Sequence, residues 1–242
     1  MKALGIDIGG TGMKGAVVDT SAGVLVTERL RIKTPKPATP EAMGRVVRKM
    51  IERFTWDGPI GCALPGPLKN GIMMTANNID KSWIGVDARD AIEKTCGRPI
   101  AVINDADAAG LAEMKFGAGQ HQRGVVLLLT LGTGIGSALF VNGVLVPNTE
   151  FGQIEVRGKK GERRAAYRVK EQKGLSWKQW SRLVSEYVDT VEQLIWPDLI
   201  IIGGGVSKKA EKFLPRIKSR TTIVPAQLRN QAGIVGAALS AL

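Results

Sequence analysis

The chain has 242 residues, of which 44% are hydrophobic, and it carries a formal net charge of +12. No apolar run reaches the about 18 residues of a membrane span, and the start MKALGIDIGG lacks a signal-peptide core, so we expect a cytoplasmic protein with a substantial hydrophobic core. Only two cysteines occur, Cys62 and Cys96, which excludes a disulfide framework and a zinc-binding spacing and predicts two buried thiols.

Strand-like runs alternate with helical segments along the chain, and this alternation predicts an α/β protein. The runs cover residues 3–9, 15–19, 23–33, 60–64, 100–105, 125–132, 137–141 and 199–205. No low-complexity linker divides the chain, so a domain boundary is expected at a short hinge near residues 105–115.

Two helices can be bounded from their capping residues. The first follows Thr39 and covers residues 40–54, with a proline in its first turn and one apolar face. The second begins after Ser176, where Gln179 can complete a capping box, and it stops at Pro197. We expect the two tryptophans of this second helix in the core or at a subunit contact.

A Gly-Thr-Gly turn between two apolar strands occurs twice. The first turn contains Gly9, Gly10, Thr11 and Gly12, and the second contains Gly132, Thr133 and Gly134. The repetition predicts a duplicated architecture in which each half presents backbone N–H groups to phosphates. A third glycine turn precedes a predicted helix start, which makes another anion-binding corner, although such a turn also serves packing. That corner contains Gly204, Gly205, Lys208 and Lys209.

Asp7 ends the first strand directly before the first glycine turn, and Lys14 follows the turn. From this place a carboxylate can hold Mg²⁺ through water against phosphates in the loop, and a lysine can neutralise phosphate oxygens. The alternative is an ordinary turn residue, but an ionised group between apolar strand residues needs a partner.

Asn104 and Asp105 follow the apolar strand that ends at Ile103, just before a predicted helix. A carboxylate at the carboxyl end of a strand is well placed to take a proton from an incoming hydroxyl. The alternative is that Asp105 or Asp107 caps the helix, and the sequence allows one to cap while the other reacts.

Several polar side chains follow the second glycine hairpin within a short stretch. They are Glu150, Gln153, Glu155 and Glu162. Closely spaced carboxylates and an amide suit the vicinal hydroxyls of a sugar, which carries no charge for an arginine to bind. Taken without context, the same residues read as exposed loop carboxylates.

The net charge of +12 predicts attraction to a polyanion, which can be a nucleic acid, a membrane surface or a polymeric phosphate. Aromatic residues make up only 5% of the chain and no DNA- or RNA-binding motif occurs, which argues against nucleic acid. The scattered basic residues argue against a membrane surface. The basic segment over residues 156–174 is expected to be a mobile or helical surface stretch. A basic surface with no ligand is the alternative.

The segments DIGGT, LPGPL, IAVINDADAAGLAEMKFGAG, LTLGTGIGSALF and IIGGGVSKK together resemble the bacterial ROK sugar kinases of the actin-like ATPase superfamily. TPKPATPEAM, NNIDKSWIGVD, VLVPNTE and QAGIVGAALS resemble the polyphosphate glucokinase branch of that family. The resemblance implies two RNase H-like α/β domains that flank a central cleft, and usually a homodimer. The small N-terminal domain would comprise residues 1–108 and 228–242, and the larger C-terminal domain residues 109–227.

The resemblance also implies a reaction, in which the terminal phosphoryl group of inorganic polyphosphate, and of ATP as a second donor, passes to the 6-hydroxyl of glucose with Mg²⁺ present. Asp105 would be the general base. The sugar would contact Gly66, Asn104, Asp105, Glu150, Gln153 and Glu162. The donor phosphates would contact Asp7, Gly9, Gly10, Thr11, Gly12, Lys14, Gly132, Thr133, Gly134, Gly204, Gly205 and Lys208, with Asp7 holding Mg²⁺ through water. A polyphosphate chain would follow a basic channel that includes Lys14, Lys208, Lys209, Arg163 and Arg164.

The chain departs from the family at Gln153, where the family pattern Glu-any-Gly-His has a histidine. Glutamine can donate a hydrogen bond to a sugar hydroxyl, but it cannot take up a proton. We therefore expect an active but weakened or retuned kinase. The alternative is a catalytically weakened homologue that binds sugar or polyphosphate as a regulatory protein.

Two further expectations come from the family. The cysteine-rich zinc motif of most ROK kinases is absent, as in the polyphosphate-using branch, so no zinc is expected. Regulators of this family carry a DNA-binding domain ahead of the first glycine loop, which here begins by residue 9, so no nucleic-acid partner is expected. The preferred donor and the range of sugars stay open.

Overall fold

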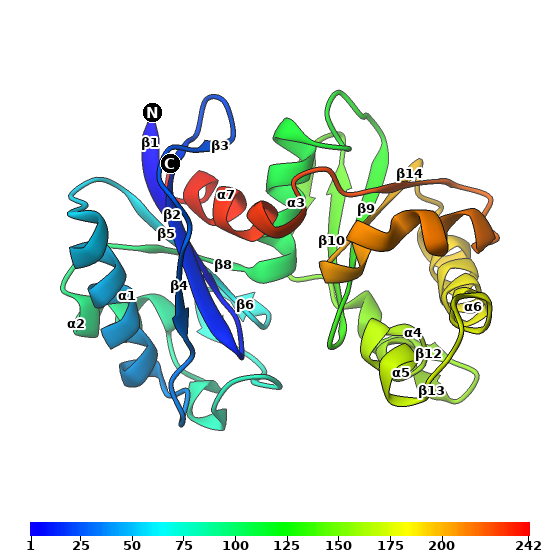
Figure 1. Ribbon diagram of the computed structural model, residues 1–242, viewed down its shortest axis with the longest axis horizontal. Coiled ribbons are helices and arrows are strands. Elements are labelled where there is room, and N and C mark those ends of the chain that lie inside the picture. Colours follow the sequence, from blue (N-terminus) through cyan, green and yellow to red (C-terminus); the bar gives the residue numbers. More distant parts are fainter. The chain divides into compact units, whose positions relative to one another are not determined.

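The computed structural model describes residues 1–242, and the chain divides into two compact units. The first unit comprises Met1–Ala112 and Gln231–Leu242, and the second comprises Glu113–Asn230. Each unit is built on one large mixed β-sheet with helices (Figure 1). The prediction of an α/β protein with two sheets is therefore confirmed. None of the helices is both long enough and apolar enough to cross a membrane.

The sheet of the first unit has the strand order β3-β2-β1-β5-β8, with β4 paired to β2. Its strands are β1 (Lys2–Ile8), β2 (Gly12–Asp19), β3 (Val24–Leu25), β4 (Leu30–Lys33), β5 (Ile60–Leu64) and β8 (Ala101–Asn104). β1 and β2 form an antiparallel hairpin around the first glycine loop, whereas β1, β5 and β8 run parallel. The carboxyl ends of the parallel strands meet at one edge, where sheets of this kind bind ligands.

The single strand expected over residues 23–33 is wrong, because residues 26–29 interrupt it between β3 and β4. The backbone N–H of Val17 donates to the side-chain hydroxyl of Thr27 at 3.0 Å, instead of to a backbone carbonyl of the outer strand. The outer strand therefore bulges at this point. The hydroxyl takes the place of a backbone carbonyl in the sheet without changing the alternation of apolar residues, so the sequence pattern could not predict this interruption.

The helices of the first unit are α1 (Pro40–Phe54), α2 (Ala88–Cys96), the first turns of α3 (Asp105–Phe116) and α7 (Ala232–Leu239). Shorter elements are β6 (Leu68–Lys69), β7 (Ile72–Met73) and the 3₁₀ helix η1 (Lys81–Trp83). The prediction for α1 is confirmed, and the Thr39 hydroxyl accepts a hydrogen bond from the backbone N–H of Ala42. Cys62 and Cys96 are buried free thiols, as expected.

Two strand glycines let α7 lie directly on the sheet. A Cβ atom at Gly5 would lie 1.9 Å from the carbonyl oxygen of Ile234, and one at Gly61 would lie 1.7 Å from that of Ala237. Both distances are far below van der Waals contact, so neither strand position admits a side chain. The C-terminal helix is thereby packed against β1 and β5, two of the strands whose ends carry site residues.

The sheet of the second unit has the order β11-β10-β9-β14-β15. Its strands are β9 (Val125–Leu131), β10 (Ile135–Val141), β11 (Val144–Val146), β14 (Leu199–Gly203) and β15 (Thr222–Pro225). β9 and β10 form an antiparallel hairpin around the second glycine loop, and β9, β14 and β15 run parallel. The second unit thus repeats the hairpin of the first, as the duplicated turn predicts.

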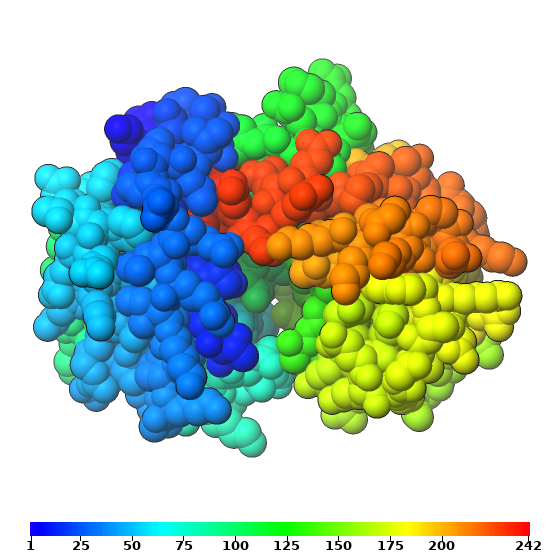
Figure 2. All heavy atoms as spheres, in the orientation of Figure 1, coloured from blue at the N-terminus to red at the C-terminus, as the bar shows by residue number.

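The helices of the second unit are α4 (Gly161–Ala165), α5 (Tyr167–Gln172) and α6 (Trp177–Ile195), with the 3₁₀ helices η2 (Phe151–Gln153), η3 (Gly205–Lys212), η4 (Leu214–Arg216) and η5 (Arg229–Gln231). The capping box of Ser176 and Gln179 is present, Trp180 is fully buried, and Trp177 is partly buried against the same core, so both predictions for α6 are confirmed. The basic segment forms α4, α5 and the small hairpin of β12 (Glu155–Val156) and β13 (Lys159–Lys160). In yellow-green, it makes part of the visible surface of the second unit (Figure 2).

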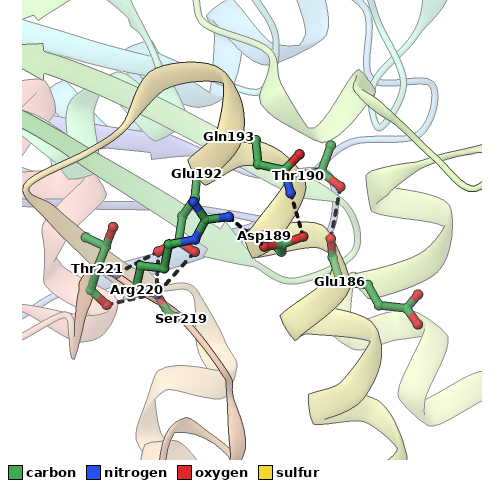
Figure 3. A network of polar contacts seen from close by, with 8 residues as sticks. All are labelled: Glu186, Asp189, Thr190, Glu192, Gln193, Ser219, Arg220 and Thr221. Atoms are coloured by element: carbon green, nitrogen blue, oxygen red, sulfur yellow. Dashed lines mark hydrogen bonds and ion pairs between the residues drawn. The ribbon is translucent and has the colours of Figure 1, made fainter.

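Glu192 of α6 is a buried carboxylate that holds the segment leading into β15 (Figure 3). It accepts hydrogen bonds from the Ser219 hydroxyl at 2.6 Å and from the backbone N–H groups of Thr221 at 2.7 Å and Arg220 at 3.3 Å. Burial by itself would raise the pKa of Glu192, but these hydrogen bonds outweigh it and lower the pKa below its ordinary value. The carboxylate is therefore ionised and structural.

Candidate active site

An ion pair lies at the base of the first glycine loop. Asp7 and Lys14 face each other across β1 and β2, and the Lys14 Nζ lies 2.9 Å from the Asp7 Oδ2. Both side chains keep solvent access, with 20% of Asp7 and 31% of Lys14 exposed. The partner that a carboxylate between apolar residues requires is thus Lys14 itself.

The glycines of the first loop are needed for space. None of Gly9, Gly10 and Gly12 has a positive φ angle. A Cβ atom at Gly10 would lie 2.6 Å from the carbonyl oxygen of Asn78, and one at Gly12 would lie 2.8 Å from the Nε of Arg31. Thr11, at the tip, is exposed. The backbone of Asn78 and the guanidinium group of Arg31 therefore pack closely against one side of the loop.

Arg31 is a candidate donor-binding residue that the sequence analysis missed. It lies on β4 opposite Lys14 of β2, and Lys33 lies opposite Gly12. Arg31 and Lys33 are both exposed and, two residues apart on a strand, point to the same face. The alternation of basic and apolar residues in RLRIK, residues 29–33, indicates a strand with a basic face. Only the pairing of β4 with β2 places that basic face beside the glycine loop.

The first unit gathers its other site residues at the carboxyl ends of neighbouring parallel strands. Asp7 of β1 pairs with Ala63 of β5, and Leu64 of β5 pairs with Asn104 of β8. Gly66 follows β5, and Asp105 follows β8 as the first residue of α3. A Cβ atom at Gly66 would lie 2.8 Å from the carbonyl oxygen of Thr75, so this glycine too is required by close approach.

Asn104 caps α3, which rules out the alternative that Asp105 or Asp107 does so. The Asn104 Oδ1 accepts hydrogen bonds from the backbone N–H groups of Ala106 at 2.8 Å and Asp107 at 3.1 Å. The physical reason is that β8 runs directly into α3, so Asp105 is already the first helical residue and Asn104 takes the capping position. The Asn104 amide oxygen is occupied, and only its NH₂ group is left to donate to a ligand.

In the second unit, the glycine loop is tighter by one residue. Ile8 pairs with Met13 around the first loop, whereas Leu131 pairs with Ile135 around the second. The backbone N–H of Gly132 donates to the carbonyl oxygen of Gly134 at 3.0 Å. No atom would lie within 4 Å of a Cβ at Gly132, so this side of the loop, next to Thr133, is open to a ligand.

The third glycine turn lies beside the second loop. Gly204 has a φ angle of +82°, and a Cβ atom there would lie 2.7 Å from the carbonyl oxygen of Leu131. The helix expected after it is instead the 3₁₀ helix η3, which is interrupted at Lys209 with φ −116°. Its hydrogen bonds are less well aligned than those of an α-helix, so the expected helix-dipole contribution is weaker. Gly205 and Lys208 are exposed.

The polar residues that follow the second hairpin are held by η2 and α4. Buried Ser137 anchors η2, because its hydroxyl donates to the Thr149 carbonyl at 2.6 Å and accepts from the Phe151 N–H at 2.9 Å. Glu150, just before η2, is exposed, and Gln153 ends η2 half-buried.

Glu162 of α4 joins the sugar segment to the second glycine loop. The Nε2 of Gln153 donates to the Glu162 Oε1 at 3.2 Å, and a Cβ atom at Gly134 would lie 2.7 Å from the Glu162 Oε2. One carboxylate therefore touches both a predicted sugar residue and a predicted phosphate loop.

Tyr187 of α6 lies beneath this carboxylate group. The ring is fully buried, and a Cβ atom at Gly161 would lie 2.6 Å from it. Burial first, and then the charges of Glu150 and Glu162, raise the pKa of the Tyr187 hydroxyl well above its ordinary value. The Tyr187 hydroxyl near Glu150 and Glu162 is therefore uncharged.

No group of three or more His, Cys, Asp or Glu side chains is arranged to hold a metal ion. Asp7 offers one carboxylate, a hard oxygen donor, beside a phosphate-type loop. That donor set fits Mg²⁺, which is commonly held by one or two carboxylates together with substrate phosphates and water.

Comparisons with known proteins give one family. The sequence profile of the ROK family matches residues 3–152. A polyphosphate glucokinase of Mycobacterium tuberculosis (strain CDC 1551 / Oshkosh) is 49% identical over 239 residues, which cover 98% of this chain and 90% of that protein.

Two solved structures agree with that result. The inorganic polyphosphate/ATP-glucomannokinase of Arthrobacter sp. strain KM is 47% identical, with a TM-score of 0.94 over 98% of this chain and 97% of that chain. A ROK family glucokinase of Streptomyces griseus, solved with glucose and AMPPNP, is 25% identical, with a TM-score of 0.85 over 100% of this chain and 99% of that chain. The chain belongs to the ROK family.

Proposed function

We propose that the protein is a glucokinase that transfers the terminal phosphoryl group of inorganic polyphosphate, and of ATP as a second donor, to the 6-hydroxyl of glucose. The observation that carries the proposal is the 49% identity to a polyphosphate glucokinase over 98% of the chain. The intact phosphate-type loops and the carboxylate after β8 support it.

Asp105 is the proposed general base. In the reaction it would accept the proton of the sugar 6-hydroxyl while that oxygen forms a bond to the terminal phosphorus and the shortened polyphosphate leaves. Its support is positional, because the Asn104 cap fixes the backbone at the start of α3 and Asp105 is not fully buried.

Glucose would be held by donors and acceptors from short loops. Asn104 would donate through its NH₂ group, Gln153 would donate through Nε2, and Glu150 and Glu162 would accept from hydroxyls. The backbone near Gly66 would contribute a further polar contact.

The donor phosphates would contact backbone N–H groups of the two glycine loops and the turn at Gly204. Asp7 would hold Mg²⁺ through water, and the ion would neutralise charge on the transferring group. Lys14, Arg31 and Lys33 would bind a polyphosphate chain beside the first loop. Arg164 is a weaker candidate for such a channel, because its side chain is only 18% exposed and is paired with Glu186.

The test is a coupled assay of glucose 6-phosphate formation with Mg²⁺ and either long-chain polyphosphate or ATP, for the unmodified protein, Asp105→Asn and the exposed control Asp57→Asn. We expect loss of a general base to lower kcat by about 10²- to 10⁴-fold and the control to behave as the unmodified protein. Turnover that survives in Asp105→Asn would contradict the assignment of the base. No turnover of any hexose with either donor would favour the regulatory alternative.

The homodimer is a separate proposal that comes from the family resemblance. Light scattering coupled to size-exclusion chromatography tests it, because a single 25.9 kDa species would contradict it.

A further inference from the structure

The amide of Gln153 lies between two charged side chains. Its Oε1 accepts a hydrogen bond from the Lys160 Nζ at 2.7 Å, and its Nε2 donates to the Glu162 Oε1 at 3.2 Å. Lys160 ends β13, and Glu162 lies two residues further on in α4. The side chain that departs from the family pattern is thus held at both ends.

The chemistry of the two neighbours fixes which way the amide points. An ammonium group can only donate hydrogen bonds and a carboxylate can only accept them, so Oε1 must face Lys160 and the NH₂ group must face Glu162. In the flipped arrangement, the NH₂ group would face an ammonium and the amide oxygen would face a carboxylate. Both contacts of the flipped arrangement are repulsive.

A glutamine needs such support more than a histidine does. Its side chain has one more rotatable bond than that of histidine, so more conformational entropy is lost when a glutamine side chain is ordered. Gln153 is half-buried at the end of a 3₁₀ helix of three residues, so packing alone does not hold it.

We propose that Lys160 is a positioning residue that holds the Gln153 amide with its NH₂ group presented for the sugar. One N–H of that group is used by Glu162, and the other is left to donate to a substrate oxygen. By fixing the Gln153 amide, Lys160 gives this chain an ordered hydrogen-bond donor at the position where the family pattern has a histidine ring. This inference rests on the proposed role of Gln153 in binding glucose.

The chain offers a matched control for the test. Lys159 precedes Lys160 on the same two-residue strand. It is also exposed, and it points to the opposite face. Lys159→Met and Lys160→Met remove the same charge from the same segment, but only the second removes the contact to Gln153.

The first measurement is glucose binding by calorimetry without a donor, followed by steady-state kinetics at saturating polyphosphate. For Lys160→Met we expect a Kd and a KM for glucose that rise about three- to tenfold, because a hydrogen bond from a partly exposed charge is lost. We expect kcat to stay within about twofold, since the reacting groups are untouched. Lys160→Arg should recover most of the affinity, and Lys159→Met should match the unmodified protein. An equal rise in Lys159→Met would overturn the proposal.

A double-mutant cycle with Gln153→Ala separates this proposal from the proposed function. If Lys160 acts through Gln153, Lys160→Met should have no further effect on glucose affinity in the Gln153→Ala background. An undiminished effect there would show that Lys160 acts on its own, which contradicts the proposal. If Gln153→Ala lowers glucose affinity while Lys160→Met does not, the positioning role alone fails. If Gln153→Ala leaves affinity unchanged, the role of Gln153 in glucose binding fails, and the positioning role fails with it.

Discussion

The two glycine loops have similar sequences but opposite charges beside them. The first loop has the Asp7–Lys14 pair at its base and the guanidinium of Arg31 against Gly12. At the corresponding base positions the second loop has Thr130 paired with Gly136, and the carboxylate of Glu162 lies against Gly134.

From this difference we propose that the two loops favour different ligands. Cations beside the first loop favour a long polyanion such as polyphosphate. A carboxylate beside the second loop repels anions on that side, so a phosphate is expected only on the open side of Gly132, through backbone N–H groups. Glu162 is better suited to sugar hydroxyls. We therefore propose that the first loop is the main contact of a long phosphate donor, whereas the second loop binds a phosphate only on its open side and has a sugar-binding carboxylate beside it. The predictions that follow test this division.

The largest expected effect is at Asp7. Asp7→Asn should weaken Mg²⁺ binding in the presence of tripolyphosphate by about 10- to 100-fold, because the charged group that holds the ion through water is lost. Lys14→Met frees the carboxylate from its partner, so it should leave Mg²⁺ affinity equal or higher while weakening tripolyphosphate binding. Calorimetric titrations of both ligands measure this, and a loss of Mg²⁺ affinity in both variants would argue against the assignment.

The next prediction compares alanine at equivalent glycines. Gly10→Ala should lower the free energy of unfolding by about 1–3 kcal/mol, because its Cβ would meet the backbone of Asn78. Gly132→Ala should change it by less than about 0.5 kcal/mol, because open space surrounds that Cβ and its φ is not positive. Denaturant unfolding measures both, and the activity of Gly132→Ala should still fall if a phosphate approaches there. Equal stability losses in the two variants would contradict the described loop geometry.

A third prediction separates structural from functional carboxylates in the second unit. Glu192 has a lowered pKa in the folded state, so its stabilisation is complete above the ordinary value of 4.5 and is lost as pH falls through the lower folded value. Glu192→Gln should cost about 1–2 kcal/mol at neutral pH and flatten the acid side of the stability profile. Its KM for glucose should not change, whereas in Glu162→Gln it should rise. An unaltered acid profile in Glu192→Gln would refute this account of Glu192.

The smallest expected effect is at Arg31. Arg31→Ala should raise the KM for long-chain polyphosphate about fivefold, less for ATP, and reduce the salt dependence of polyphosphate binding, because one exposed cation is lost. Arg53→Ala, which removes an exposed arginine from the end of α1, is the control. Similar effects of the two variants would mean that only the overall charge matters.

Local signals predicted much of the fold. The caps of α1 and α6, the two glycine hairpins and the polar residues after parallel strands all depend on neighbours in sequence. The bulge at Thr27, the Asn104 cap and the 3₁₀ form of η3 escaped prediction, because each depends on one hydrogen bond or one turn that the apolar pattern does not record.

The charged neighbours of the site could not be predicted for a related reason. Arg31 reaches Gly12 only because β4 pairs with β2 in a particular register, and Lys160 reaches Gln153 only because the β12–β13 hairpin folds back. Such contacts are set by pairing between segments, and spacing along the chain gives no measure of them.

The most direct test of the central claim is calorimetric binding of polyphosphate and of glucose to Arg31→Ala and Glu162→Gln. The account predicts a crossed result, in which Arg31→Ala weakens polyphosphate and leaves glucose unchanged, while Glu162→Gln weakens glucose and leaves polyphosphate equal or tighter. If both variants weaken the same ligand, the charged groups beside the two loops do not serve the phosphate donor and the sugar separately, and the account is contradicted.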